Sequence, residues 1–148
     1  TSYDLIIEDI VVSVYSPEYF TESDFYVDDS NVVNTNLTII KQTPIGVEGR
    51  FSIKGAWMGE YVIDIGIDVT MDFCDSLEEP ILISPFFTAI GFNANNCPPG
   101  VGVYGLEGYQ IPMEQLPDDF MPNNYKVVLD IFYEDQSLLI FDIFSKVT

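Results

Sequence analysis

The feature that most constrains this chain is an alternation of apolar and polar side chains with a period of two, clearest between Trp57 and Phe73. Odd positions in this stretch are mostly large and apolar, and acids recur at even positions, namely Asp64, Asp68 and Asp72. Because successive side chains of a β-strand point to opposite faces, the pattern predicts one long strand with an apolar face and a carboxylate face. Gly59 and Gly66 are the predicted points for a bend or bulge in this strand.

Several shorter segments repeat the pattern along the rest of the chain. We expect strands at residues 5–15, 37–40, 47–53, 125–133 and 138–147. The last two flank a polar turn at residues 134–137 and are predicted to form a hairpin. Six or more strands joined by short turns indicate an all-β fold, either an antiparallel two-sheet sandwich or a cup. At 148 residues the chain corresponds to one domain, residues 1–148.

The alternation stops in the segment between the two cysteines. Asp75 or Ser76 can cap the start of a helix there, and Pro80 fits an early helical position. A second proline, Pro85, prevents a long regular helix. We therefore predict one short helix or an irregular apolar segment, followed by a rigid turn at residues 95–100.

The charge of the chain excludes several classes of partner. Five basic and 24 acidic residues give a formal charge of −19. Binding to nucleic acid requires cations that replace condensed counterions, so we expect no nucleic-acid partner. Anionic membrane surfaces are disfavoured for the same reason. No apolar run approaches the roughly 18 residues that span a bilayer, so stable membrane insertion is not expected.

The residue types also limit the chemistry. Histidine is absent, which removes histidine general bases, histidine-activated nucleophiles and histidine-containing zinc sites. The Gly-x-Ser-x-Gly, Ser-x-x-Lys and glycine-rich phosphate-loop motifs are absent as well. We therefore predict no catalytic residues, no metal ligands and no cofactor.

Carboxylates are the remaining candidate for chemistry. Adjacent pairs occur at Asp28-Asp29, Glu78-Glu79 and Asp118-Asp119. Neighbouring residues on a strand point to opposite faces, so such pairs form no acid–base dyad unless they lie in loops. We interpret the acids as a solvated surface that keeps the protein soluble. Loose calcium binding and a carboxylate-dependent hydrolase are the alternatives.

The two cysteines, Cys74 and Cys97, bear on the compartment. Their even number, in a chain that begins at Thr1 without a basic-then-apolar leader, favours a mature secreted protein with one disulfide. Such a bridge closes a loop of about 24 residues and contributes roughly 3 kcal/mol. Two free buried thiols in a cytosolic protein are the alternative. The tripeptide Asn36-Leu37-Thr38 predicts N-glycosylation of Asn36 and also favours secretion.

A series of short motifs follows in order along the second half of the chain. They are Asp72-Phe73-Cys74, Asn96-Cys97-Pro98-Pro99-Gly100, Tyr104, Leu116-Pro117 and Asn124-Tyr125-Lys126-Val127. This order resembles the ganglioside activator-like proteins of the ML-type lipid-recognition superfamily, nearest their insect CheB-like chemosensory relatives. The resemblance implies a β-cup, in which two antiparallel sheets splay around an apolar cavity that holds a lipid. The chain departs from the ganglioside activator in having cysteines for one disulfide rather than four, and in its stronger negative charge.

An excess of aromatic residues agrees with an apolar binding site, since large ligand sites are lined mainly by apolar and aromatic side chains. The chain has 11 Phe, 9 Tyr and 1 Trp. The predicted cavity lining comprises Trp57, Tyr61, Ile63, Ile65, Met71, Phe73, Phe86, Phe87, Phe92, Leu129, Ile131 and Phe141. The same residues could instead fill a solid core, which is the commoner use of an apolar strand face in sandwiches.

Two functional hypotheses follow. The first is a secreted, non-enzymatic binding protein, a monomer or weak homo-oligomer, that carries or sequesters a hydrophobic small molecule such as a fatty acid, terpenoid or sterol-like lipid. The second is a secreted structural or adhesive β-sandwich with a solid core and no ligand.

Overall fold

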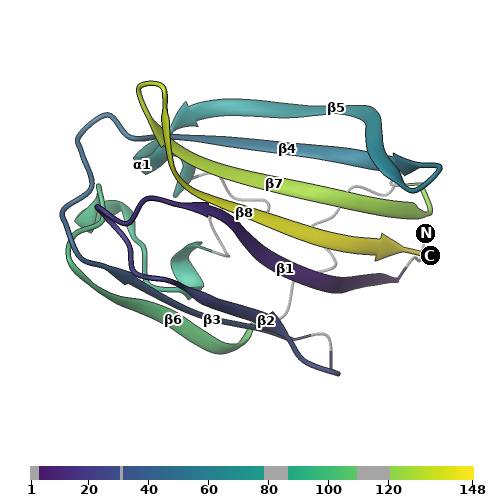
Figure 1. Cartoon of the computed structure of the whole chain (residues 1–148), viewed down its shortest axis with the longest axis horizontal. Helices are drawn as coiled ribbons and strands as arrows, with labels where there is room; N and C mark the ends of the chain where they lie inside the picture. Colours follow the sequence, from purple (N-terminus) through teal and green to yellow (C-terminus); the bar gives the residue numbers. More distant parts are fainter. Residues whose placement is uncertain (1–3, 31, 79–86, 110–120) are drawn as a thin grey trace.

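The computed structural model describes residues 4–30, 32–78, 87–109 and 121–148, which form two antiparallel β-sheets (Figure 1). The larger sheet has the strand order β1-β8-β7-β4-β5 and comprises β1 (Leu5–Tyr15), β8 (Gln136–Val147), β7 (Asn123–Tyr133), β4 (Glu48–Trp57) and β5 (Glu60–Asp72). The smaller sheet has the order β2-β3-β6 and comprises β2 (Asp24–Val27), β3 (Val33–Ile39) and β6 (Gly102–Tyr109). The predicted fold class, an antiparallel two-sheet β fold with one short helix, is confirmed.

The long strand predicted from Trp57 to Phe73 is divided by a tight hairpin. Trp57 ends β4 and pairs with Glu60, the first residue of β5. The two residues between them both have positive φ, +52° at Met58 and +84° at Gly59, as a type I′ turn requires. The bend expected at Gly59 is therefore a complete reversal of the chain.

Two register shifts interrupt the pairing of β4 with β5. Ser52 pairs with Asp68 but Lys54 pairs with Asp64, so the β5 strand carries two extra residues around Gly66. Gly66 has φ +80°, and the bulge predicted there is confirmed. A second, one-residue shift lies at Val62 and decides where the side chain of Tyr61 points.

The main hydrophobic core lies between the two sheets. Its fully buried members include Phe141 and Leu139 of β8 and Leu37 of β3, each with no exposed area. Strand β1 contributes Ile7 and Ile10, which both point inward because a bulge lies between them. With simple alternation, residues three positions apart would point to opposite faces. The bulge adds one residue, so Ile7 and Ile10 share a face.

The segment after β5 closes one end of this core. Helix α1 (Phe73–Ser76) is capped by the carboxylate of Asp72, which accepts hydrogen bonds from the backbone N–H groups of Cys74 and Asp75 at 2.9 and 3.2 Å. The expected short helix is thus present, but the prediction that Asp75 or Ser76 would cap it was wrong. Asp72 is the last residue of β5, directly before the helix, so its side chain reaches the first N–H groups that have no partner within the helix.

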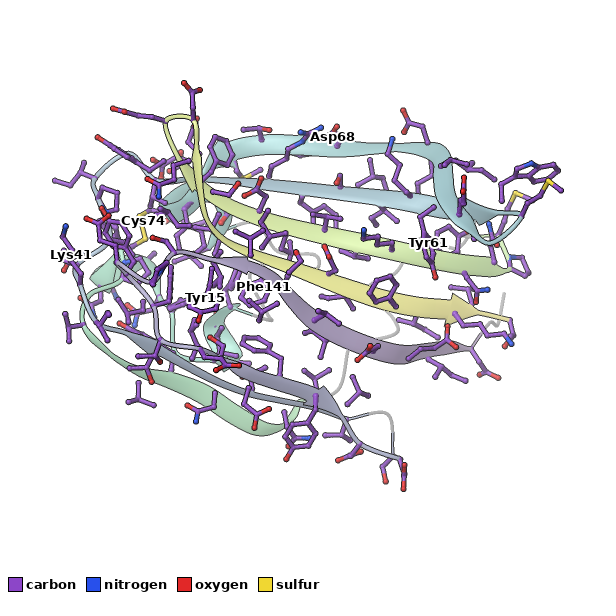
Figure 2. The ribbon with its side chains drawn as sticks, viewed as in Figure 1. Tyr15, Lys41, Tyr61, Asp68, Cys74 and Phe141 are labelled. Atoms are coloured by element: carbon purple, nitrogen blue, oxygen red, sulfur yellow. A yellow bond between two sulfur atoms is a disulfide. The ribbon has the colours of Figure 1, made fainter. Side chains whose placement is uncertain are left out.

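A disulfide joins α1 to the turn before β6. Cys74 and Cys97 are bonded, with their Cα atoms 5.7 Å apart, as the cysteine count suggested. The 3-10 helix η1 (Ala94–Asn96) precedes Cys97, and the peptide bond from Cys97 to Pro98 is cis. Figure 2 shows Cys74 and Lys41 toward one end of the long axis and Tyr61 toward the other. No helix in the described part of the chain is long and apolar enough to cross a membrane.

Candidate functional site

An apolar surface lies on the inner face of the five-stranded sheet, at the end away from the disulfide. Its buried centre consists of Ile53, Tyr125 and Val147, and the partly buried residues Leu5, Phe51, Ile65, Ile67 and Val127 pack against that centre. All five strands of the larger sheet contribute to it. We call these eight residues, together with Ile63 and Val69 of β5, the inner-face patch.

The three-stranded sheet covers the other end of the molecule. Its residues Val33, Leu37 and Ile39 belong to the main core and not to the cluster around Ile53. In Figure 1 the five-stranded sheet extends past the β2–β3 end toward the two chain termini. The part of the patch around Ile53, Tyr125 and Val147 therefore forms a cluster separate from the core under the smaller sheet, whereas Phe51 and Val69 also border Phe73 and Phe87 of that core.

The patch remains partly exposed along β5. Ile63 and Val69 keep 37% and 43% of their surface accessible, whereas Ile53 of the neighbouring strand β4 keeps 2%. Strand β5 is an edge strand, so it has β4 on one side only. A row of apolar side chains that faces the interior of the fold and still contacts solvent offers area for an apolar ligand.

Half of the twelve predicted cavity residues lie in the main core. They are Phe73, Phe87, Phe92, Leu129, Ile131 and Phe141, each no more than 6% exposed. The ring of Phe73 contacts the rings of Phe87 and Phe92 with centroids 5.2 and 5.8 Å apart. Met71 is half-buried beside this group, while Ile63 and Ile65 belong to the inner-face patch.

Among the described residues, two small cavities lie beside these aromatic rings. A cavity of about 10 Å³ lies among Met71, Phe73, Phe87 and Ile131, and a second of about 10 Å³ lies among Phe20, Thr43, Pro99 and Leu139. Each is about the size of one water molecule. Neither can hold a lipid, so any ligand of that size has to occupy another part of the fold.

Two predicted residues lie outside both regions. Trp57 is 62% exposed at the β4–β5 hairpin. Tyr61, which is labelled in Figure 2, lies on the outer face of the five-stranded sheet. There its ring contacts that of Phe144, with centroids 5.6 Å apart. The bulge at Val62 rotates Tyr61 away from the face that carries Ile63. Phe86 lies outside the described residues.

The outer face of the five-stranded sheet carries four of the five cations of the protein, Arg50, Lys54, Lys126 and Lys146. Arg50 donates two hydrogen bonds to Asp68, from Nε to Oδ1 at 2.8 Å and from Nη2 to Oδ2 at 2.6 Å. These hydrogen bonds lower the pKa of the Asp68 carboxyl. Lys126 lies over the ring of Phe144, 5.8 Å from its centroid. The fifth cation, Lys41, pairs with Glu18 on the surface.

Several of the carboxylates considered from the sequence have structural partners. Asp28 accepts hydrogen bonds from the N–H groups of Ser30 and Val32 in the β2–β3 turn. Asp64 accepts one from Gly66 at 2.9 Å, and Asp72 caps α1. Within the described residues, no group of three or more acids or cysteines is placed to hold a metal ion. Glu79, Asp118 and Asp119 lie outside the described residues.

The sequence reasoning left several patch residues out of the predicted lining, namely Leu5, Phe51, Ile53, Ile67, Val69, Tyr125, Val127 and Val147. Their alternation was visible, but it did not show which part of each strand the second sheet would cover. A further residue, Thr35 of β3, gave no signal in the sequence because an isolated threonine in a strand is common.

Asn36, the predicted glycosylation site, is exposed on the outer face of β3. Its partner on β6 is Gly105, which has no side chain, so that side of Asn36 is unobstructed. No protein-family model matches this chain, and no curated protein matches it.

Proposed function

We propose that this protein is a secreted, non-enzymatic binding protein that holds a hydrophobic small molecule against the inner-face patch. The single observation that carries the proposal is the row of apolar side chains along β5, which faces the interior and remains 37% and 43% exposed at Ile63 and Val69. Covering such a row with an apolar ligand removes it from water at about 25 cal/mol per Å². The ML-type resemblance, with its splayed two-sheet cup, supports the same reading.

The proposed ligand class is an apolar molecule such as a fatty acid, terpenoid or sterol-like lipid, bound by a monomer or weak homo-oligomer. The four cations of the larger sheet lie on its outer face, so the patch itself consists of apolar side chains and the tyrosine Tyr125. Apolar contact therefore supplies most of the binding energy. The surface charge of −19 keeps a loaded carrier soluble.

Secretion is part of the proposal and rests on the Cys74–Cys97 bridge, because structural disulfides persist mainly in oxidising compartments. Exposed Asn36 is the proposed glycosylation site. Expression in a secreting eukaryotic cell should give protein whose mass falls on treatment with an N-glycosidase. The Asn36→Gln variant should lack that shift.

The ligand site is tested by the Ile65→Trp variant. Ile65 packs at the side of the patch, so a tryptophan there should occupy ligand space and lower the affinity for a fluorescent fatty acid, with little loss of stability. Ile140→Trp is the matched control, because Ile140 lies on the outer face of the same sheet and is also partly buried. The control should retain the affinity of the wild type.

A structural or adhesive β-sandwich is the second candidate, and the two cavities of about 10 Å³ favour it, since they leave little free space around Phe73 and Phe20 among the described residues. On that hypothesis Ile65→Trp overpacks the protein and lowers the free energy of unfolding by about 1–3 kcal/mol. A destabilised variant, together with a wild type that binds neither the fluorescent fatty acid nor an uncharged apolar fluorophore, would rule out the carrier.

A further inference from the structure

We infer that the hydroxyl group of Thr35 is the polar anchor of the bound molecule, and that the ligand therefore carries an uncharged oxygen function such as an alcohol, ester, ketone or aldehyde. This inference rests on the proposed function and specifies which apolar molecules the site prefers.

The first observation is the state of the hydroxyl itself. Thr35 is 7% exposed, and its Oγ1 is buried without a hydrogen-bond partner among the described residues. A buried hydroxyl that leaves water and gains no partner costs free energy, so native proteins nearly always pair such groups. The orphaned oxygen of Thr35 therefore points to a partner that the described part of the chain does not supply.

The second observation is the direction of the side chain. Thr35 lies two residues from Leu37 on β3, and Leu37 is fully buried in the core between the sheets, so both side chains face inward. The cross-strand partner of Thr35 is Phe25 of β2, whose ring contacts Phe141 of the opposite sheet with centroids 4.8 Å apart. The hydroxyl therefore faces the space between the two sheets.

The third observation is the position along the strand. Thr35 is near the start of β3, next to the β2–β3 hairpin, whereas Ile39 is at the other end. In Figure 1 this hairpin is the part of the smaller sheet that reaches toward the end where the chain termini lie. An extended ligand with its apolar part on the inner-face patch can therefore bring one end toward Thr35.

The charge distribution decides the chemical class of that end. Four cations lie on the outer face of the larger sheet, and Lys41 pairs with Glu18 at the surface, so a carboxylate beside Thr35 would meet no counterion. Burying an unpaired charge costs far more than burying a neutral oxygen. A threonine hydroxyl can donate to a neutral carbonyl or ether oxygen, and it can also accept from an alcohol.

The test compares dodecanol, dodecane and dodecanoate as competitors of a neutral naphthylamine fluorophore, so that chain length is constant. Wild type should bind dodecanol more tightly than dodecane, and dodecanoate should be the weakest of the three. The isosteric variant Thr35→Val should reduce the dodecanol-to-dodecane affinity ratio by about two- to tenfold, the value of one net hydrogen bond. Thr35→Ser keeps the hydroxyl and should keep the ratio. Thr38→Val, the same change on the outer face of β3, should also keep it.

Each outcome has a distinct meaning. Failure of the fluorophore to bind wild type overturns the carrier function and this inference together. Normal binding with an unchanged ratio in Thr35→Val overturns the inference alone and assigns the hydroxyl to bound water. Preference for dodecanoate overturns the neutral-ligand class. Thermal unfolding of Thr35→Val verifies that the variant is folded, and its melting temperature should be equal to or above that of wild type, because the substitution removes an unpaired buried hydroxyl.

Discussion

Replacing Met58 by asparagine should stabilise the protein, even though it removes a large apolar side chain. Met58 occupies the first turn position of the β4–β5 hairpin with φ +52°, a left-handed conformation that costs an ordinary residue roughly 1–2 kcal/mol. Asparagine adopts this conformation more readily, and Asn-Gly is the preferred pair for a type I′ turn. The Met58 side chain is 87% exposed, so little apolar burial is lost.

The expected gain for Met58→Asn is about 0.5–1 kcal/mol in the free energy of unfolding. For a chain of this size that gain corresponds to about 1–4 °C in the melting temperature. Urea unfolding and thermal unfolding, both followed by circular dichroism, measure it. Ile45→Asn is the control, because Ile45 is also 87% exposed but has no positive φ, and it should change stability little. A Met58→Asn protein no more stable than wild type would refute the reasoning.

Three further predictions concern the disulfide, a close backbone contact and a buried tyrosine. Replacing Cys74 and Cys97 by serine should lower the free energy of unfolding by about 3 kcal/mol, and native protein should offer no thiol to an alkylating reagent in mass analysis. Gly105→Ala should cost about 1–3 kcal/mol in urea unfolding, because its Cβ would lie 2.5 Å from the carbonyl oxygen of Thr35. Gly49→Ala, whose Cβ meets Phe73 at 3.8 Å, should cost less. Burial raises the pKa of the Tyr125 hydroxyl, so the folded state keeps this proton to a higher pH than the unfolded state does. The protonated side chain therefore contributes its full stability below about pH 10, and that contribution is lost as the pH rises through the raised pKa of the folded state. Wild type should therefore lose stability more steeply than Tyr125→Phe when urea unfolding is compared at about pH 9 and about pH 11.

Alternation in the sequence was enough to predict two antiparallel sheets, and β1 and β7 nearly to the residue. It did not locate the turn between β4 and β5, because the bulge at Val62 compensates for the two-residue turn and odd positions are apolar on both sides of it. Tyr61 was consequently expected on the face that carries Ile63. A bulge depends on how two strands pair, and a single strand's pattern does not contain that information.

The candidate site was harder to predict than the fold for a related reason. Phe141 and Ile65 both occupy inward positions on their strands, yet Phe141 is fully buried in the core and Ile65 is only partly buried. The difference arises from where the three-stranded sheet lies over the five-stranded one. Strand β2 has only four residues, and β6 has three glycines among its eight residues, so neither gave a clear strand pattern from the residues alone.

The placement of Arg50, Lys54, Lys126 and Lys146 on one face gives the two sheets different charge patterns. Carboxylates such as Asp64, Asp68 and Asp130 lie among these cations on the larger sheet, whereas the strands of the smaller sheet contain no lysine or arginine. Three of the four lysines of the protein therefore lie on one face. Coupling through lysine amines to an activated support should attach the protein mostly by the outer face of the larger sheet and leave the smaller sheet toward the solution.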